Sequence, residues 1–388
     1  KLLWAPLVDS LYISSFGRRK TWMVPTQVLI GVVMMCSSMR LNSLLYGEQP
    51  AILPLMLLFL LMNFLCATQD IAVDGWALTM LRKENSSYQA TCNAAGQTFG
   101  FTLGWTGVTL LQQLQLLNVS GFMFFTGIIF ISVTLVVAVL KPEMQLRKED
   151  QPKGVTESYR SIFSMLKLKP IRTLIAVLFT WKLGFAVVDS VAPLKFQEYG
   201  VPKESLTYMG SLLMPLEIML PLFASHWTAG PMPFNLALWM YPFKVAIVPI
   251  TAVLAHGTPS MHPFPWGFWI SMMAVAVIGS VTTEWMFVSQ IAFFARVSDP
   301  SIGGTYMSFL NTMANLGQKL PPTATFFLVD HLTCREDSCF LKADGFYVMT
   351  CACTIIGVVW YVLAVRPIQH MQAQDVEEWK IIRSKKVK

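Results

Sequence analysis

The feature that most constrains this chain is a succession of apolar stretches, each long enough to cross a lipid bilayer as a helix. About 20 mostly apolar residues suffice for one crossing. Ten stretches pass: 21–39, 51–81, 88–111, 121–140, 171–191, 206–225, 236–255, 266–295, 303–329 and 345–365. The residues before Asp9 read as the end of an eleventh. We therefore expect an all-α, multi-pass membrane protein.

The composition excludes a water-soluble protein of this size. Charged residues make up 13% of the chain, against about 25% in soluble domains, and the mean hydropathy is +0.53. The formal charge of +7 has a simpler cause than nucleic-acid binding, because basic residues collect in loops on one side of a membrane. The lipid bilayer is the expected environment, and nucleic acid is not an expected partner.

The distribution of basic residues predicts the orientation. If the loop with Arg18 and Arg19 is cytosolic, most of the 29 Lys and Arg residues fall on the cytosolic side. The sequon at Asn118 then lies in a non-cytosolic loop and is a predicted glycosylation site. Cys334 and Cys339 share another non-cytosolic loop, where a disulfide is permitted, although free thiols are the alternative.

A polar insertion divides the spans into two sets. We expect an N-terminal helical bundle over 1–140, a cytosolic linker over 141–170, a C-terminal six-helix bundle over 171–366 and a cytosolic tail over 367–388. With the first helix and most of the second absent from this chain, the count fits two six-helix bundles. That layout is typical of the major facilitator superfamily.

A first group of candidate residues lies near the cytosolic ends of the spans. Asp9, Arg18 and Arg19 flank a short loop and are candidates for a gate latch, as are Asp70 and Asp74, which share one helix face. For the arginines, the alternative is that they only mark the cytosolic side of the membrane. For the two aspartates, the alternatives are a solute or proton site, or a solvated helix end.

A second group consists of polar side chains inside spans, where charges are costly and often functional. The candidates for substrate binding are Lys182, Asp189, Lys244, Lys319, Asn93, Gln97, Glu284, Asn311 and Asn315. They predict a polar, partly cationic cavity, and Lys182 and Asp189, two turns apart, could neutralise each other. The alternative for each is a satisfied contact between helices. No catalytic residue, metal ligand or cofactor is expected, since no span offers a His-Asp pair or a metal-binding cluster, so the chain does not look like an enzyme.

Several blocks carry a family resemblance. LLWAPLVDS near the start, ATQDIAVDGWALTML at 67–81 and VSDPSIGGTYMSFLNTMANLG at 297–317 resemble the acetyl-coenzyme A transporter family of the endoplasmic reticulum membrane. That family belongs to the major facilitator superfamily and is related to bacterial muropeptide permeases. The resemblance implies a multi-pass protein of the endoplasmic reticulum that imports cytosolic acetyl-CoA into the lumen for acetylation there, with free CoA as a conceivable counter-substrate.

Two expectations depend on that resemblance. Lys385 and Lys386 resemble a dilysine retrieval signal, with a basic tail on an anionic leaflet as the alternative. Acetyl-CoA needs Lys or Arg for its phosphates and an aromatic face for adenine, for which Lys182, Lys195, Lys244 and Lys319 with Trp105 or Trp181 are candidates. Transport of another anionic or peptidic solute and a membrane-embedded acyltransferase stay open as alternatives.

Overall fold

The computed structural model describes residues 1–46, 52–81, 88–143, 154–261, 263–333 and 344–380. Every regular element among them is a helix, and no described residue lies in a strand. Within these described ranges, seven helices are long and apolar enough to cross a membrane: α2, α3, α6, α11, α12, α13 and α15. The predicted all-α membrane fold of the facilitator type is therefore confirmed.

The first helix group comprises the elements before residue 141. They are α1 (Ala5–Ser10), α2 (Lys20–Tyr46), α3 (Ile52–Met80), α4 (Tyr88–Thr102), the π-helical turn η2 (Leu103–Gly107), α5 (Val108–Gln113) and α6 (Val119–Leu140). Helix α2 packs along α3 and α6, whereas α4 packs mainly against α11 and α13 of the other group.

The second helix group follows the connecting helix α7 (Val155–Lys167). It contains α8 (Lys169–Thr180), η4 (Trp181–Gly184), α9 (Ala186–Ser190), α10 (Ala192–Glu198), α11 (Lys203–Thr228), α12 (Asn235–Gly257), η5 (Thr258–Ser260), α13 (Trp266–Val297), η6 (Pro300–Ile302), α14 (Gly303–Leu332), α15 (Gly345–Ala373) and η7 (Val376–Glu378). Helix α12 packs against α13 and α15, and α14 packs against α8 and α15.

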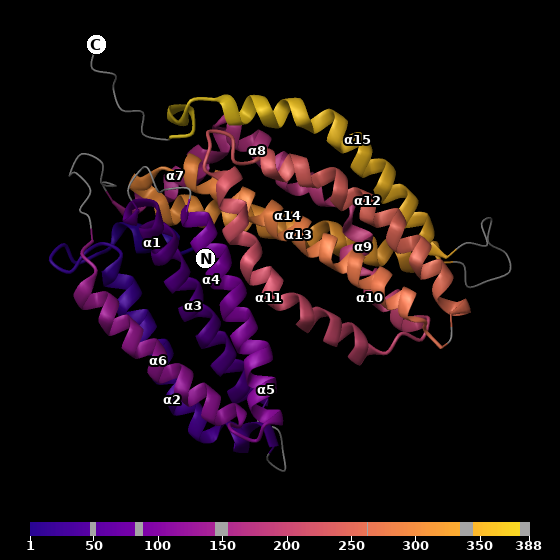
Figure 1. Ribbon diagram of the computed structural model, residues 1–388. Helices are drawn as coiled ribbons and strands as arrows, with labels where there is room; N and C mark the ends of the chain where they lie inside the picture. The colour runs from indigo at the N-terminus through magenta and orange to yellow at the C-terminus, as the bar shows by residue number, and fades with distance from the viewer. Residues whose placement is uncertain (47–51, 82–87, 144–153, 262, 334–343, 381–388) are drawn as a thin grey trace.

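The two groups meet at one end and diverge toward the other (Figure 1). We call the first end, which holds Arg18 and Arg19, the arginine end, and the opposite one, which holds Asn118 and Asp344, the far end. Contacts of α14 with α1 and α3, and of α4 with α11 and α13, join the groups. A small buried cluster that includes Ala90, Ala224 and Ile291 lies at the second of these contacts.

Three of the ten expected spans depart from one continuous apolar helix. The stretch 88–111 contains the π-helical turn η2, and 171–191 is divided among α8, η4 and α9. Helix α14 runs unbroken for 30 residues, but Asn311, Asn315 and Gln318 make it less apolar than the seven. These three segments supply much of the polar interior described below.

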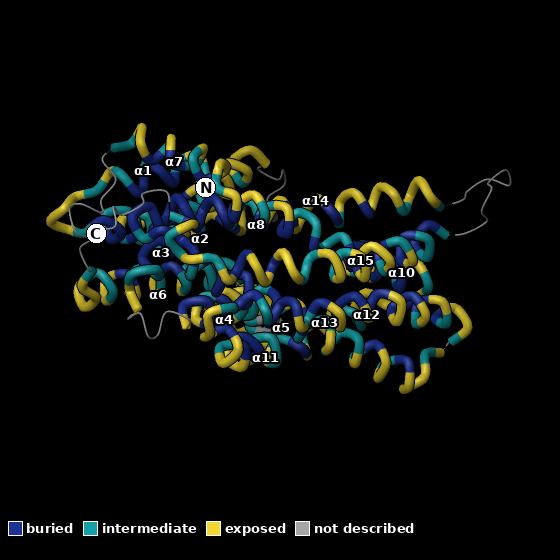
Figure 2. The backbone as a smooth tube through the Cα atoms, turned by 90° about the horizontal axis from the view of Figure 1, so that it is seen from above, coloured by how far each residue is buried: buried dark blue, intermediate teal, exposed yellow. Residues whose placement is uncertain are grey.

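The outer surface is apolar, as contact with lipid requires. Residues such as Phe59, Val139 and Leu363 are more than half exposed, and exposed and buried turns alternate along most helices (Figure 2). In water such surface would be unfavourable, whereas in a bilayer it contacts hydrocarbon. The arrangement therefore needs a membrane around it.

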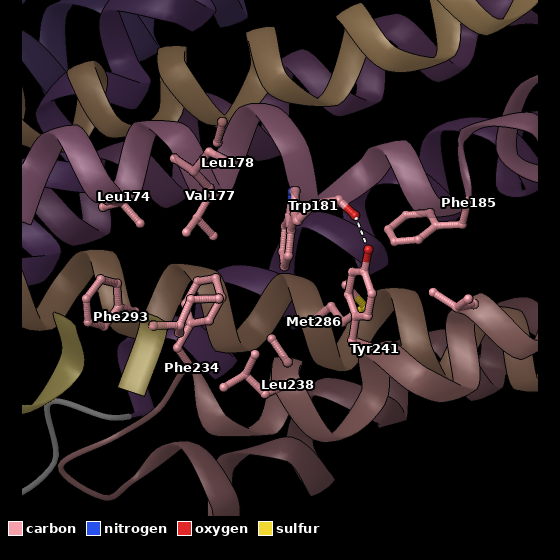
Figure 3. Packing of buried hydrophobic residues seen from close by; sticks show 14 of the residues in the cluster. Leu174, Val177, Leu178, Trp181, Phe185, Phe234, Leu238, Tyr241, Met286 and Phe293 are labelled. Carbon is pink, nitrogen blue, oxygen red and sulfur yellow. Dashed lines mark hydrogen bonds between the residues drawn. The ribbon is translucent and has the colours of Figure 1, made fainter. Parts of the chain in front are cut away.

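The core of the second group encloses the break in the helix formed by α8 and α9. Trp181 packs against Phe234, and the Tyr241 hydroxyl donates a hydrogen bond to the Trp181 carbonyl oxygen at 3.0 Å (Figure 3). The interruption leaves that carbonyl available, and Tyr241 satisfies it from α12. The break is thus a packed feature of the fold.

The C-terminal segment continues the fold beyond residue 366. Helix α15 extends to Ala373, and Trp379 is 1% exposed and packs edge-on against Phe293. The Tyr306 hydroxyl donates to the Trp379 carbonyl oxygen at 2.8 Å. The sequence predicts a cytosolic tail over 367–388, and its residues up to Lys380 pack against the bundle through buried aromatic contacts. The domain boundaries stay predictions.

Candidate functional site

Two adjoining cavities lie between the helix groups. The first, of about 400 Å³, is bordered by α4, η4, α9, α11, α12, α13 and α14. The second, of about 590 Å³, lies closer to the arginine end and is bordered by α3, α4, α13 and α14. They share Gln97, Phe287, Gln290 and Gln318. Each is within the range of about 300–1,000 Å³ that small-molecule sites occupy.

An ion pair borders the first cavity. The Lys244 Nζ atom lies 3.0 Å from Asp189 Oδ1 and donates to Thr283 Oγ1 at 2.9 Å. The ammonium also lies 5.4 Å from the centre of the Phe185 ring. Lys244 is 6% exposed, and a buried ammonium needs such partners. The charge of Lys244 is therefore compensated by the protein itself.

Lys182 borders the same cavity in a different situation. It lies on η4, at the break next to Trp181. Within the described chain its ammonium has no hydrogen bond or ion pair, and Asp189 pairs with Lys244 instead. Lys182 and Asp189 therefore do not form an ion pair in this conformation, although both border the cavity. Of the two lysines that border this cavity, Lys182 is the one without a hydrogen bond or ion pair among the described residues.

Two glutamates border the first cavity from helices α11 and α13, which pack against each other. Glu217 on α11 accepts a hydrogen bond at Oε1 from the Ser280 hydroxyl, at 2.8 Å. Glu284 on α13 has a buried Oε2 atom with no hydrogen-bond partner among the described residues. With Asp189, these side chains give three carboxyl groups against the ammonium groups of Lys182 and Lys244. The first cavity is therefore polar and partly cationic, and with all five groups ionised it would carry one net negative charge.

The second cavity is lined mainly by uncharged polar groups. Asn93 and Gln97 are hydrogen-bonded to each other along α4, and Asn311 and Asn315 face them from α14. The Asn311 Nδ2 atom donates to Asp74 Oδ2 at 3.1 Å, which connects the two helix groups. The structure thus brings these four predicted residues together in the second cavity, which adjoins the cavity that Lys182 and Lys244 border.

Asp9, Arg18 and Arg19 form a buried tie at the arginine end. Arg19 pairs with Asp9 through Nη1, and Arg18 donates through Nη2 to the Ser301 carbonyl oxygen at 2.8 Å. The other Asp9 oxygen accepts from the Thr305 backbone N–H at 2.5 Å. Three segments distant in sequence are therefore joined, and the two helix groups are held together at this end.

Electrostatics favour the ionised form of Asp9 in the tie. Burial alone would raise the pKa of its carboxyl group, but Arg19, Arg18 and the Thr305 hydrogen bonds outweigh burial and lower it. Glu143 supports the same loop, since its Oε1 accepts from the Arg19 backbone N–H at 2.8 Å. The ion pair therefore stays intact at neutral pH.

Several predicted residues lie elsewhere than expected. Asp70 pairs with Lys1 at 2.5 Å and Asp74 with Asn311, so neither pairs with Arg18 or Arg19 as a gate salt bridge would require. Lys319 is exposed and borders neither cavity. The cause is tertiary: Asp9 occupies the arginines, and Lys319 lies one position beyond Gln318, on another face of α14.

The remaining predicted positions lie at the ends of the molecule. Asn118 is exposed, and its Oδ1 caps α6 by accepting from the Gly121 N–H at 2.7 Å. Lys195 is buried near the far end, where it pairs with Glu198 and Asp344 rather than facing either cavity. Cys334, Cys339, Lys385 and Lys386 lie outside the described residues.

The sequence analysis missed Phe101 and Gln318 as lining residues and Glu143 as a support for the arginine loop. One of them had a signal: Gln318 continues the stripe of Asn311 and Asn315 at helical spacing. Of the expected adenine partners, Trp181 borders the first cavity, whereas Trp105 is exposed and stacks on Phe101, which does border it.

Comparison with known proteins agrees with this architecture. The chain is 28% identical over 98% of its length to an uncharacterized protein of Schizosaccharomyces pombe, covering 79% of that protein. It is 25% identical over 98% of its length to an uncharacterized membrane protein of Saccharomyces cerevisiae, covering 88% of it. The anhydromuropeptide permease of Escherichia coli is 28% identical over 130 residues, 30% of this chain and 25% of the permease.

A family model matches almost every residue. The matched segments are 1–153, 143–235 and 234–381, and the model is described as acetyl-coenzyme A transporter 1. Together with the helical membrane fold and the two cavities between the helix groups, this match means that the chain belongs to the acetyl-coenzyme A transporter family of membrane transporters.

Proposed function

We propose that the protein carries acetyl-CoA from the cytosol into the lumen of the endoplasmic reticulum by alternating access. The observation that carries the proposal is Lys182, an ammonium group without a partner among the described residues, in a cavity between the two helix groups. Acetyl-CoA presents phosphates that such a group binds by charge-assisted hydrogen bonds. Phe101, which is exposed, offers an aromatic ring to adenine in the same cavity.

The conformation fits one half of such a cycle. The groups are tied at the arginine end through Asp9, Arg18 and Arg19, and they diverge toward the far end (Figure 1). If the arginine end is cytosolic, as the basic loops predict, this is a lumen-facing state. Release of the tie and closure at the far end would give the cytosol-facing state.

Reconstitution tests the proposal. The complete protein in proteoliposomes should accumulate doubly labelled acetyl-CoA, with the acetyl and adenine labels in an unchanged ratio. Preloading with free CoA tests counter-exchange, since exchange would accelerate uptake. Absence of protein-dependent accumulation would contradict the proposal, and transfer of the acetyl label to a supplied acceptor would indicate an acyltransferase instead.

A second candidate substrate class has one observation in its favour. The first cavity places carboxyl groups beside ammonium groups, a pattern that also suits a solute with charges of both signs, such as a peptide. An anhydromuropeptide permease is among the relatives. Competition decides between the two substrate classes. If free CoA inhibits acetyl-CoA uptake more strongly than a muropeptide does, the result favours acetyl-CoA.

A further inference from the structure

The charges of the first cavity do not suit an anion as they stand. Its titratable groups are Lys182 on η4, Asp189 on α9, Glu217 on α11, Lys244 on α12 and Glu284 on α13, and the α4 and α14 residues that border it are uncharged. Ionised together, they leave one net negative charge. An anion entering this cavity would be repelled unless a carboxyl group were neutralised.

The hydrogen bonds of the three carboxyl groups differ, and they indicate which one is the best candidate to be protonated. Asp189 is bound to Lys244, and Glu217 accepts a hydrogen bond from Ser280, which stabilises a carboxylate. Glu284 has neither kind of partner at Oε2, which is buried. A carboxylate oxygen without a partner is costly away from water, whereas a protonated carboxyl group is much less so.

Glu217 adds to the effect, because its hydrogen bond with Ser280, one helical turn before Glu284 on α13, places its negative charge close to Glu284. Two neighbouring carboxyl groups hold their first proton more tightly than either would alone. We propose that Glu284 is a proton-binding site and that its proton is taken up together with the anionic substrate. This inference rests on the proposed function for the identity of the anion, but not for the proton site itself.

The balance of the binding step is simple. A proton from solution adds to Glu284 Oε2, and the neutral side chain leaves Lys182 and Lys244 against Asp189 and Glu217. The cavity then has no net charge before the anion enters, and Lys182 is free to bind phosphate. A bound proton raises the affinity of the cavity for the anion, and by linkage a bound anion raises the affinity of Glu284 for the proton by the same factor. The affinity for the anion therefore falls as the pH rises.

Binding measurements test the coupling. With acetyl-CoA as the probe and the complete purified protein, affinity should fall about tenfold per pH unit above the pKa of the site. Glu284→Gln, which mimics the protonated group, should bind acetyl-CoA with little dependence on pH. Glu217→Gln, on the neighbouring helix α11, should keep a pH dependence but move it to lower pH, because the charge that helps Glu284 to hold its proton is removed. An affinity of the unmodified protein that does not change with pH would overturn the coupling.

Infrared difference spectra between acidic and alkaline pH test the proton site without substrate. The unmodified protein should show the C=O stretch of a protonated carboxylic acid, and Glu284→Gln should lose it. Persistence of the whole band in Glu284→Gln would overturn the assignment. If acetyl-CoA binds at no pH, the proposed function fails, and the infrared result still decides the proton site.

Discussion

Asp189 on α9 binds Lys244 on α12, with 3.0 Å between Oδ1 and Nζ, although Lys182 is the nearer lysine in sequence. The pairing divides the two cavity lysines into one with a compensated charge and one without. It follows that substitutions of the two should differ in kind: loss of Lys244 would leave a carboxylate unpaired, whereas loss of Lys182 would remove only a ligand-binding group.

Lys182→Gln should therefore weaken acetyl-CoA binding without much loss of stability. Hydrogen bonds to charged groups contribute about 1.5–3 kcal/mol, which corresponds to a loss of affinity of roughly 10- to 100-fold. Lys319→Gln is the matched control, because Lys319 is exposed and borders neither cavity. Equilibrium binding to purified protein measures both. Equal losses in the two variants would contradict the assignment.

Asp9→Asn should loosen the arginine end. Removing one member of a buried ion pair typically costs about 3–5 kcal/mol, and Asp9 is 0% exposed and pairs with both arginines. Asp70→Asn is the control, since Asp70 is 52% exposed and its pair with Lys1 should contribute about 1 kcal/mol or less. Thermal unfolding in detergent compares the two variants.

The same pair has a predictable pH dependence. The folded-state pKa of Asp9 is lowered, so its stabilisation is present above the ordinary value of 3.8 and is lost only as the pH falls through the lower folded value. A cysteine placed at Ser301 reports closure of the arginine end through its rate of thiol labelling. That rate should be constant through neutral pH. Opening between pH 6 and about 5, well above the Asp range, would contradict this.

Gly317→Ala should destabilise the second helix group. A Cβ at Gly317 on α14 would run into the backbone carbonyl of Leu178 on α8, so the two helices would have to separate. Overpacking of this kind costs about 1–3 kcal/mol. Gly210→Ala on α11 is the control, because a Cβ there meets nothing within 4 Å. A thermal unfolding temperature lowered equally by both changes would rule out the close contact as the cause.

Asn118 tests the orientation of the chain. Its Oδ1 caps α6, which leaves Nδ2 for a glycan. In cells, the glycosylated protein should show a shift in gel mobility when it is treated with an endoglycosidase. Both Asn118→Gln and Ser120→Ala should abolish this shift, and Ser120→Ala does so without removing the Asn118 helix cap. A protein without any such shift would count against a luminal far end.

Trp379→Ala should release the C-terminal segment. The side chain is 1% exposed, and truncating a buried tryptophan costs about 3–5 kcal/mol. Limited proteolysis should then cut after α15 faster than in the unmodified protein. Trp266→Ala serves for comparison, since Trp266 is 84% exposed, and its cleavage pattern should not change.

The sequence predicted what depends on length and hydropathy, and it missed what depends on tertiary contacts. Seven expected spans are continuous helices, because hydrocarbon-length apolar segments have little choice in a bilayer. Pairing Lys182 with Asp189 assumed one unbroken helix. The η4 turn changes their relative direction, and the Tyr241 hydrogen bond that holds the break comes from 60 residues away.

The candidate site shows the same division. Polar residues inside spans were recognisable one by one, and Asn93, Gln97, Asn311 and Asn315 do line one cavity. Their partners were not recognisable, because Asp74 finds Asn311 on a helix 237 residues later. The share of lysines was also not recognisable: Lys195 and Lys319 were candidates for the cavity, yet neither borders it.

The tie at the arginine end has a consequence for how the protein seals the membrane. One carboxyl group, that of Asp9, serves Arg19 with one oxygen and the Thr305 backbone with the other. If either Arg19 or the Thr305 backbone moves away, the buried Asp9 carboxylate loses part of its stabilisation, which weakens the reason for the other contact to persist. The two contacts should therefore break together. Opening in a single step would leave little time in half-separated forms through which small ions could leak.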